Sequence, residues 1–272
     1  MSWLTDKFSF TVAVLFYGIS VVYSVFLWRK GFREDNRVNY FLLLAAAIFH
    51  TTAMIKRGFS LERCPVNNLF EATMFVTWTM VVAYLVFGLW SKIRFLGAFA
   101  SPILFAIGVF ALMPSLDVRG PKPEFSGGLV SLHATLILLS YGAFGLGSIA
   151  GIMYVTQEHD LKFHKLRAVF SRLPPIERME KVMNGLLIAG FILLSGGLLL
   201  SPILLKQKYD VYFNNDPKLI WSMIVWVVYL MLLLLHGRFA QGGRRFAWGA
   251  IGSFAFVLLT FWGVNLLSPA HQ

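Results

Sequence analysis

Cysteine and charged residues are both scarce in this sequence. The single cysteine, Cys64, cannot form an intramolecular disulfide, and there is no CxxC pair for metal or redox chemistry. Charged residues make up only 14% of the 272 residues, whereas a soluble domain has about 25%. Hydrophobic residues make up 57%, and a soluble chain of this size could not bury such helices on every side. The composition therefore predicts an all-α, polytopic membrane helix bundle.

Basic residues give the chain a formal net charge of +11. In a soluble protein this charge would suggest a nucleic-acid partner. Here the basic residues occupy short loops between apolar runs, where they set the orientation of membrane helices. We therefore expect a lipid bilayer around the protein and no nucleic-acid partner.

Apolar runs of about twenty residues, the length that crosses a bilayer, recur along the chain. They predict eight transmembrane helices, at about 8–28, 38–55, 69–90, 95–113, 128–156, 182–204, 217–237 and 246–267. The first run lacks a small-residue cleavage site, so we interpret it as a retained span rather than a signal peptide. Residues 1–272 are thus predicted to form a single transmembrane domain.

Lysine and arginine are unevenly shared between alternate loops. Most of the 24 basic residues lie in one set, formed by 29–37, 91–95, 157–181 and 238–245. Because cytoplasmic loops carry an excess of these residues, this set is predicted to be cytoplasmic. Both termini and the polar, aromatic loop 206–218 then lie on the outer side. The mixed charges and proline pair of 157–181 favour a surface helix and a turn, with solvated histidines such as His159.

Four histidines lie in or beside apolar sequence, where the residue is rare enough to need a reason. His133 is predicted near the outer end of the fifth span, and His271 just after the outer end of the eighth. His50 is predicted in the middle or outer half of the second span, and His236 near the inner end of the seventh. Two pairs of imidazoles in apolar surroundings suit axial ligation of haem iron. The alternative is that each histidine hydrogen-bonds a neighbouring helix.

His50 and His236 are harder to bring to one haem than His133 and His271. At 1.5 Å per residue, the predicted depths of His50 and His236 differ by roughly ten ångströms. Tilted helices or shifted helix ends would have to close this gap.

Other residues mark helix starts and packing faces. Glu71 is predicted to open the third span, either as part of a capped first turn with Asn68 or as a contact to a haem pocket or partner. Asp216 is predicted to cap a helix that begins at Pro217. The fifth span has a face suited to close helix packing, formed by Tyr141, Gly142, Phe144, Gly145, Gly147 and Gly151.

Motifs in four regions resemble the cytochrome c assembly superfamily, whose members include the CcsA haem-handling proteins and the shorter HemX/YpjD-like proteins. In chain order they are Pro65, Asn68 to Glu71 and Trp78; His133, Leu139 to Tyr141 and Phe144; Asp216 to Lys218, Trp221, Trp226, Tyr229, His236 and Arg238; and Gly263 to Leu267 with His271. All four occur in the family's order, and together they cover nearly the whole chain after the first span.

The resemblance implies a protein of the bacterial inner (plasma) membrane that binds haem b. In the family, two outer histidines flank a tryptophan-rich loop that presents haem to apocytochrome c, and His133 and His271 match that pair by position. His50 and His236 would be the membrane pair. Asp216 and Trp221 would belong to the outer site. The resemblance also implies a ResB-like membrane partner. Any catalysis would be that of a haem lyase (cytochrome c synthetase) complex, and we expect no catalytic residue from this chain.

The sequence departs from the family in the loop before Asp216. Tyr209, Tyr212 and Phe213 stand there in place of several tryptophans, and Leu219 stands where the family has glutamate. Tyrosine and phenylalanine can still stack on a porphyrin. The resemblance therefore supports haem binding more firmly than haem attachment.

These observations lead to two main hypotheses. The first is a protein of cytochrome c biogenesis that handles or exports haem for attachment to apocytochrome c. The second is a HemX-like membrane regulator of haem biosynthesis without attachment activity, which the missing tryptophans favour. A transporter with a histidine proton relay comes third, because the sequence has no inverted repeat of the kind that transporters often show.

Overall fold

The described part of the chain is entirely helical. The computed structural model describes residues 5–29, 37–61, 68–89, 94–117, 128–162, 175–210, 217–238 and 243–267. Within these ranges there is no strand. The elements are α1 (Asp6–Arg29), α2 (Arg37–Leu61), α3 (Leu69–Gly88), α4 (Leu96–Ala111), the 3-10 helix η2 (Pro114–Leu116), α5 (Gly128–Lys162), α6 (Ile176–Tyr209), α7 (Pro217–Arg238) and α8 (Gly243–Leu267). The prediction of an all-α bundle of eight helices is confirmed.

Within the described residues, six helices are long and apolar enough to cross a membrane. The candidate spans are Asp6–Arg29, Arg37–Ser60, Leu69–Val86, Gly128–His159, Ile176–Gln207 and Leu219–Arg238. The α4 helix is also apolar but has only 16 residues, a length of about 24 Å at 1.5 Å per residue. The protein is therefore a multi-pass membrane protein.

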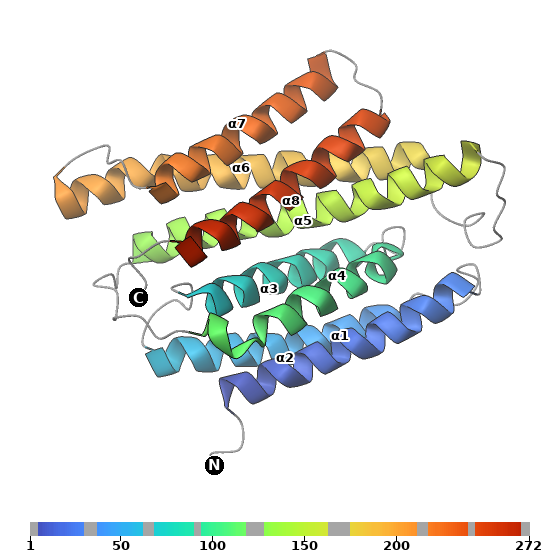
Figure 1. The fold of residues 1–272 in the computed structure, drawn as a ribbon, viewed down its shortest axis with the longest axis horizontal. Coiled ribbons are helices and arrows are strands. Elements are labelled where there is room, and N and C mark those ends of the chain that lie inside the picture. The colour runs from blue at the N-terminus through green and yellow to red at the C-terminus, as the bar shows by residue number, and fades with distance from the viewer. Residues whose placement is uncertain are drawn as a thin grey trace.

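The helices form two groups that meet along α3 and α5. The first group, α1 to α4, and the second group, α5 to α8, occupy opposite sides of the bundle in Figure 1. The most extensive contacts within the groups are between α5 and α6 and between α1 and α2, and the groups touch chiefly through α3 and α5. Successive helices run in opposite directions. One end of the bundle, the first end, therefore holds the starts of α1, α3, α5 and α7, and the second end holds their last turns.

The α5 helix is the centre of the fold because it packs against α3, α6 and α8. Its glycines permit this close packing. A Cβ atom on Gly142 would overlap Thr79 of α3, including its backbone. A Cβ on Gly151 would lie 3.1 Å from the carbonyl oxygen of Ala247 in α8. The packing face predicted on the fifth span is confirmed.

Replacing Gly142 by alanine is expected to destabilise the bundle. The added methyl group would push α5 away from Thr79, and overpacking of this kind costs about 1–3 kcal/mol. The matched control is Gly185→Ala in α6, where an added Cβ meets nothing within 4 Å. Thermal unfolding of the detergent-purified variants should show a lower midpoint for Gly142→Ala only. Equal midpoints for the two variants would contradict this account of the packing.

Buried polar side chains join α1 to α2 and to α4. Ser20 of α1 donates a hydrogen bond to the Asn39 side-chain oxygen at 2.6 Å, and its hydroxyl also lies 2.6 Å from that of Ser101 in α4. All three side chains are fully buried. Hydrogen bonds of this kind hold helices together where apolar contacts are no stronger than those with lipid.

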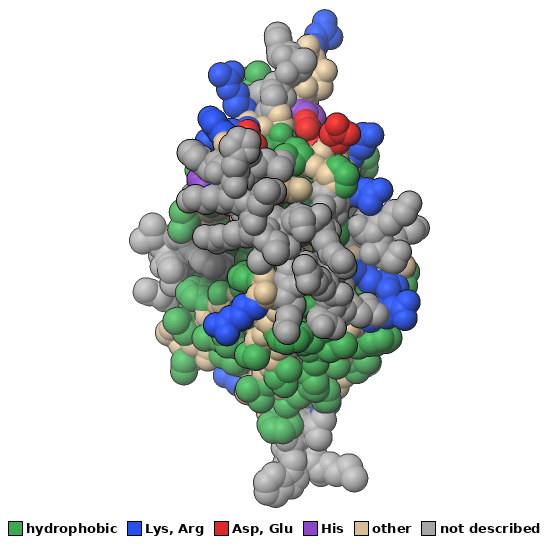
Figure 2. All heavy atoms as spheres, turned by 90° about the vertical axis from the view of Figure 1, so that its right-hand side faces the viewer, with side chains coloured by type: hydrophobic (Ala, Val, Ile, Leu, Met, Phe, Trp, Pro, Cys, Tyr) green, Lys and Arg blue, Asp and Glu red, His purple; other side chains and the backbone are tan. Residues whose placement is uncertain are grey.

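Basic side chains gather at the second end of the bundle, the end that faces the viewer in Figure 2. The exposed ones are Arg29, Arg37, Lys162, Arg178, Lys181, Arg238, Arg244 and Arg245. These residues come from the loops, or from the helix ends beside them, that the sequence pattern assigns to the cytoplasm.

Two segments predicted as loops are partly helical. In place of a loop at 157–181, α5 continues to Lys162 and α6 begins at Ile176. In place of a loop at 206–218, α6 continues to Tyr209, and α7 begins at Pro217 as predicted. An apolar run marks only the part of a helix that lies in hydrocarbon, whereas backbone hydrogen bonding extends into the polar residues beyond it.

Candidate functional site

His133 lies near the start of α5, at the first end of the bundle. Its Nδ1 atom is 2.8 Å from the backbone oxygen of Gly197 in α6. Because a carbonyl oxygen only accepts hydrogen bonds, Nδ1 carries a proton in this contact. In the neutral ring, Nε2 is then the atom with the free lone pair, which is the state in which imidazole binds a metal.

The surroundings of His133 fit an axial ligand of haem. The imidazole is half-buried, while Leu129 and Leu132 on the preceding turn are 43% and 47% exposed. A porphyrin needs apolar contacts on its faces and an imidazole whose second nitrogen is held by the protein. Both are available here, so the residues present fit the predicted group at this position.

His50 has very different surroundings. It is fully buried in α2, and its Nδ1 lies 3.0 Å from the Tyr17 hydroxyl of α1. Phe10 packs against the ring edge to face, with 4.9 Å between the centroids. The Nε2 atom makes no hydrogen bond of normal geometry with a described residue, although the Met74 backbone lies near the ring. Iron ligation through Nε2 would require these packed side chains to move apart.

His236 lies in the last turn of α7, at the second end. Its Nε2 atom is 3.7 Å from the Glu180 carboxylate of α6. The ring stacks face to face on Phe246 of α8, with 3.8 Å between the centroids. A ligand role through Nε2 would require the imidazole to turn away from Glu180.

The structure does not bring His50 and His236 together. The α2 and α7 helices lie at opposite edges of the bundle in Figure 1. The ring contacts described for His50 come from α1, and those for His236 come from α6 and α8. Sharing one haem would require the two helix groups to rearrange, and ligation by this pair stays a prediction.

The remaining predicted site residues lie near the start of α7 and at the end of the chain. The indole nitrogen of Trp221 is buried and has no hydrogen-bond partner among the described residues, and the ring packs on Phe256 of α8 at 4.9 Å. One turn further along α7, Trp226 donates to the Ser195 hydroxyl at 2.8 Å. Asp216 and His271 lie outside the described residues, so their predicted roles stay predictions.

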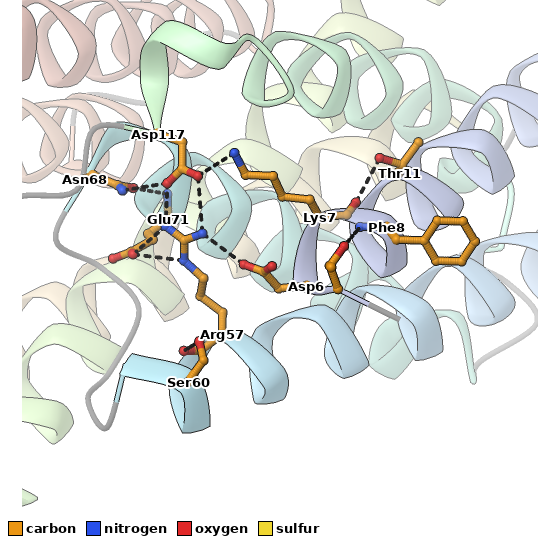
Figure 3. Close-up of polar contacts among 10 residues, drawn as sticks. Asp6, Lys7, Phe8, Thr11, Arg57, Ser60, Asn68, Glu71 and Asp117 are labelled. Carbon is orange, nitrogen blue, oxygen red and sulfur yellow. Dashed lines mark hydrogen bonds and ion pairs between the residues drawn. The ribbon is translucent and has the colours of Figure 1, made fainter. Parts of the chain in front are cut away.

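A network of charged side chains, centred on Arg57, lies at the first end of the bundle (Figure 3). We call it the Arg57 network, and it consists of Asp6, Lys7, Arg57, Asn68, Glu71 and Asp117. Arg57 donates to Glu71 at 3.0 and 3.1 Å and to Asp6 at 2.9 Å. It also donates to Asp117, which Lys7 contacts at 2.7 Å. The network therefore joins α1, α2, α3 and the segment after α4.

The capping role predicted for the first turn at Glu71 is confirmed, whereas a contact from Glu71 to a haem pocket or partner stays a prediction. The Asn68 side-chain oxygen accepts a hydrogen bond from the Glu71 backbone N–H at 2.8 Å, which is the predicted cap of α3. The Glu71 side chain is fully buried and pairs with Arg57. The sequence did not reveal Arg57, Asp6 or Asp117 as parts of this arrangement.

Arg57 and Lys7 keep the Asp117 carboxyl ionised. Burial would raise the pKa of this group, but the hydrogen bonds from Arg57 and Lys7 outweigh burial and lower the pKa to about 2. The Asp117 carboxylate therefore stays ionised and paired with Arg57 and Lys7 at physiological pH.

Aromatic contacts connect the Arg57 network to His50. The Arg57 guanidinium lies 5.1 Å from the centroid of the Phe70 ring. Phe70 packs edge to face on Phe10 at 5.6 Å, and Phe10 contacts His50. A continuous row of packed side chains therefore joins the network to the surroundings of His50.

The apolar helices and the half-open imidazole at one end of the bundle define a membrane protein with a candidate haem site. A profile of the family described as "Cytochrome C assembly protein" matches residues 66–271. The chain therefore belongs to this family. The match includes His133, His236 and His271, whereas α1 and α2, with His50 and Arg57, precede it.

Curated relatives match over almost the whole chain. The cytochrome c biogenesis protein CcsA of Prochlorococcus marinus (strain NATL1A) is 26% identical over 96% of this chain and 94% of its own length. The protein of the same name from Guillardia theta is 26% identical over 96% and 93%, and that from Trieres chinensis is 25% identical over 94% and 90%. The resemblance stated from the motifs is confirmed.

Proposed function

We propose that this protein handles haem in cytochrome c biogenesis, holding it at the first end of the bundle for attachment to apocytochrome c. Membership of the family and the names of the CcsA relatives support this role. The observation that carries the proposal is the state of His133. Its Nδ1–H is bound by the Gly197 carbonyl, which leaves the lone pair of the neutral ring on Nε2, and the residue is only half-buried near the start of α5.

His133 would hold the iron of haem b together with His271, the second outer histidine. Trp221, whose buried indole N–H has no partner among the described residues, would shape the same region from α7, together with Asp216. His236 and His50 would serve a second position within the membrane. Of these two, His236 has the stronger support because it lies within the region that the family profile matches.

The chain contributes binding and orientation rather than a nucleophile. Attachment joins reduced haem to two cysteine thiols of a CxxCH segment in the apocytochrome. The reacting groups therefore belong to haem and to its acceptor. The imidazole of His133 would fix the position of the iron, and the apolar side chains around it would exclude water. If attachment is catalysed, the haem lyase would be a complex of this chain with a ResB-like membrane partner.

The distribution of charge supports an orientation in the bacterial inner membrane. The basic second end (Figure 2) would face the cytoplasm, since cytoplasmic segments carry the excess of Lys and Arg. The first end, with His133, the start of α1 and the end of α8 (Figure 1), would then face outward. Among the six candidate spans, α7 buries the smallest share of its surface, which leaves an apolar face for a partner helix or for lipid.

Deletion of the gene tests the proposal. We expect covalent haem staining of c-type cytochromes to fall to background, while b-type haem in the same membranes is retained. Expression of the wild-type gene from a plasmid should restore the stain. Intact c-type cytochromes together with altered tetrapyrrole levels would contradict the proposal and indicate the HemX-like regulator instead.

A further inference from the structure

We propose that Gly197 is a positioning residue for the His133 imidazole, setting its tautomer and its orientation toward iron. The proposal rests on the haem-handling function proposed above and adds a residue of α6 to the outer site. It is carried by one contact, the 2.8 Å hydrogen bond from His133 Nδ1–H to the Gly197 carbonyl oxygen.

The contact depends on the absence of a side chain at position 197. A Cβ atom there would lie 2.7 Å from Cγ1 of Ile137, 3.5 Å from the Ile137 nitrogen and 3.6 Å from the His133 carbonyl oxygen. The first of these distances is shorter than real contacts of Cβ atoms. Any residue larger than glycine would therefore force either the Ile137 side chain or α6 itself to shift at the turn that supplies the carbonyl, and we expect this shift to disturb the hydrogen bond.

The hydrogen bond determines which ring nitrogen can bind iron. With the proton held on Nδ1, the lone pair is on Nε2 and the ring cannot rotate freely about its side-chain bonds. A partner on the second nitrogen also raises the basicity of the imidazole as a ligand, and loss of such a partner typically lowers metal affinity about 10–100-fold. Gly197 therefore affects the iron through His133 without touching it.

A neighbouring glycine offers a matched control. Gly196 is the adjacent residue of the same helix, but a Cβ at this position would meet only Leu136, at an ordinary 3.8 Å. The variants Gly197→Ala and Gly196→Ala therefore add the same methyl group to adjacent residues, with a steric conflict at only one of them.

The first measurement uses the haem-free protein. Nitrogen-15 NMR of histidine-labelled, detergent-purified protein should show His133 as the Nδ1–H tautomer in the wild type and in Gly196→Ala. In Gly197→Ala we expect a mixture of tautomers. The double variant Gly197→Ala with Ile137→Ala removes the conflicting Cγ1 atom and should recover the Nδ1–H tautomer. An unchanged tautomer in the Gly197→Ala variant would overturn the proposal.

The second measurement uses the haem-loaded protein. We expect Gly197→Ala to bind haem about 10–100-fold more weakly than Gly196→Ala and to have a higher reduction potential, because a less basic imidazole stabilises ferric iron less. The double variant should return both values toward those of the wild type. Equal affinity and potential in the two glycine variants would overturn the proposal. A wild-type protein that binds no haem would instead contradict the proposed function, and the tautomer measurement would still decide the structural role of Gly197.

Discussion

Replacement of Arg57 by alanine is expected to lower the stability of the protein by about 3–5 kcal/mol. Removing one member of a buried ion pair leaves the other charge in a medium that solvates it poorly, and this is the usual size of the effect. The Arg57 side chain is 3% exposed, while Glu71 and Asp117, which it contacts, are 0% and 5% exposed. Thermal unfolding of the detergent-purified variant should show the loss as a lower midpoint.

A surface ion pair provides the control for this prediction. Lys206 and Asp210 lie 2.6 Å apart, with side chains 42% and 89% exposed. Exposed pairs of this kind contribute less than about 1 kcal/mol, so Lys206→Ala should leave the unfolding midpoint nearly unchanged. A loss for Arg57→Ala as small as that for Lys206→Ala would show that the Arg57 network does not hold the first helix group together.

A double variant separates lost charge pairing from lost packing. Arg57→Met retains much of the side-chain volume, and Glu71→Gln removes the buried negative charge. If unpaired charge is the main cause of the instability, the two substitutions together should cost clearly less than the sum of their separate effects. Strict additivity would assign the effect to packing against Phe70 instead.

The fold could be predicted from the sequence because lipid imposes a simple pattern. Each apolar run of about twenty residues must satisfy its own backbone hydrogen bonds and therefore forms a helix. The glycines of α5 also gave its packing face, since small residues at helical spacing permit close approach. The helix ends were less accurate, because Lys162 and Tyr209 extend α5 and α6 beyond their apolar runs.

The site could be predicted only in part, because its contacts join distant parts of the chain. His133 stands out from the sequence as a histidine in apolar surroundings, but the Gly197 carbonyl that binds it lies 64 residues further on. Likewise Arg57 and Asp117 are 60 residues apart. Arg57 and Asp117 each lie next to an apolar run, where a charged residue is expected in any membrane protein. Neither residue therefore stood out in the sequence. Only the packing of α2 against α1 and α3 places these charges in one buried network.

Replacement of His133 by alanine is expected to abolish haem binding at the outer site. The Gly197 carbonyl holds the His133 ring through Nδ1, and Nε2 is the iron ligand that we propose. Removal of an axial ligand should weaken binding at least as much as the roughly 10–100-fold loss that follows removal of an outer partner. The measurement is the reduced-minus-oxidised absorption spectrum of the detergent-purified protein, with haem content per chain determined alongside. The low-spin b-type signal of the wild type should be lost or strongly reduced in the variant.

Two other histidine variants test whether the loss of the haem signal is specific to His133. His159→Ala removes an exposed imidazole at the second end and should leave the spectrum unchanged. His236→Ala removes the histidine that faces Glu180, and it should abolish only the signal of a second, membrane site. Full loss of the signal in His236→Ala, with none in His133→Ala, would assign the haem to the second end of the bundle. In that case the hydrogen bond between His133 and Gly197 would serve only to pack α5 against α6.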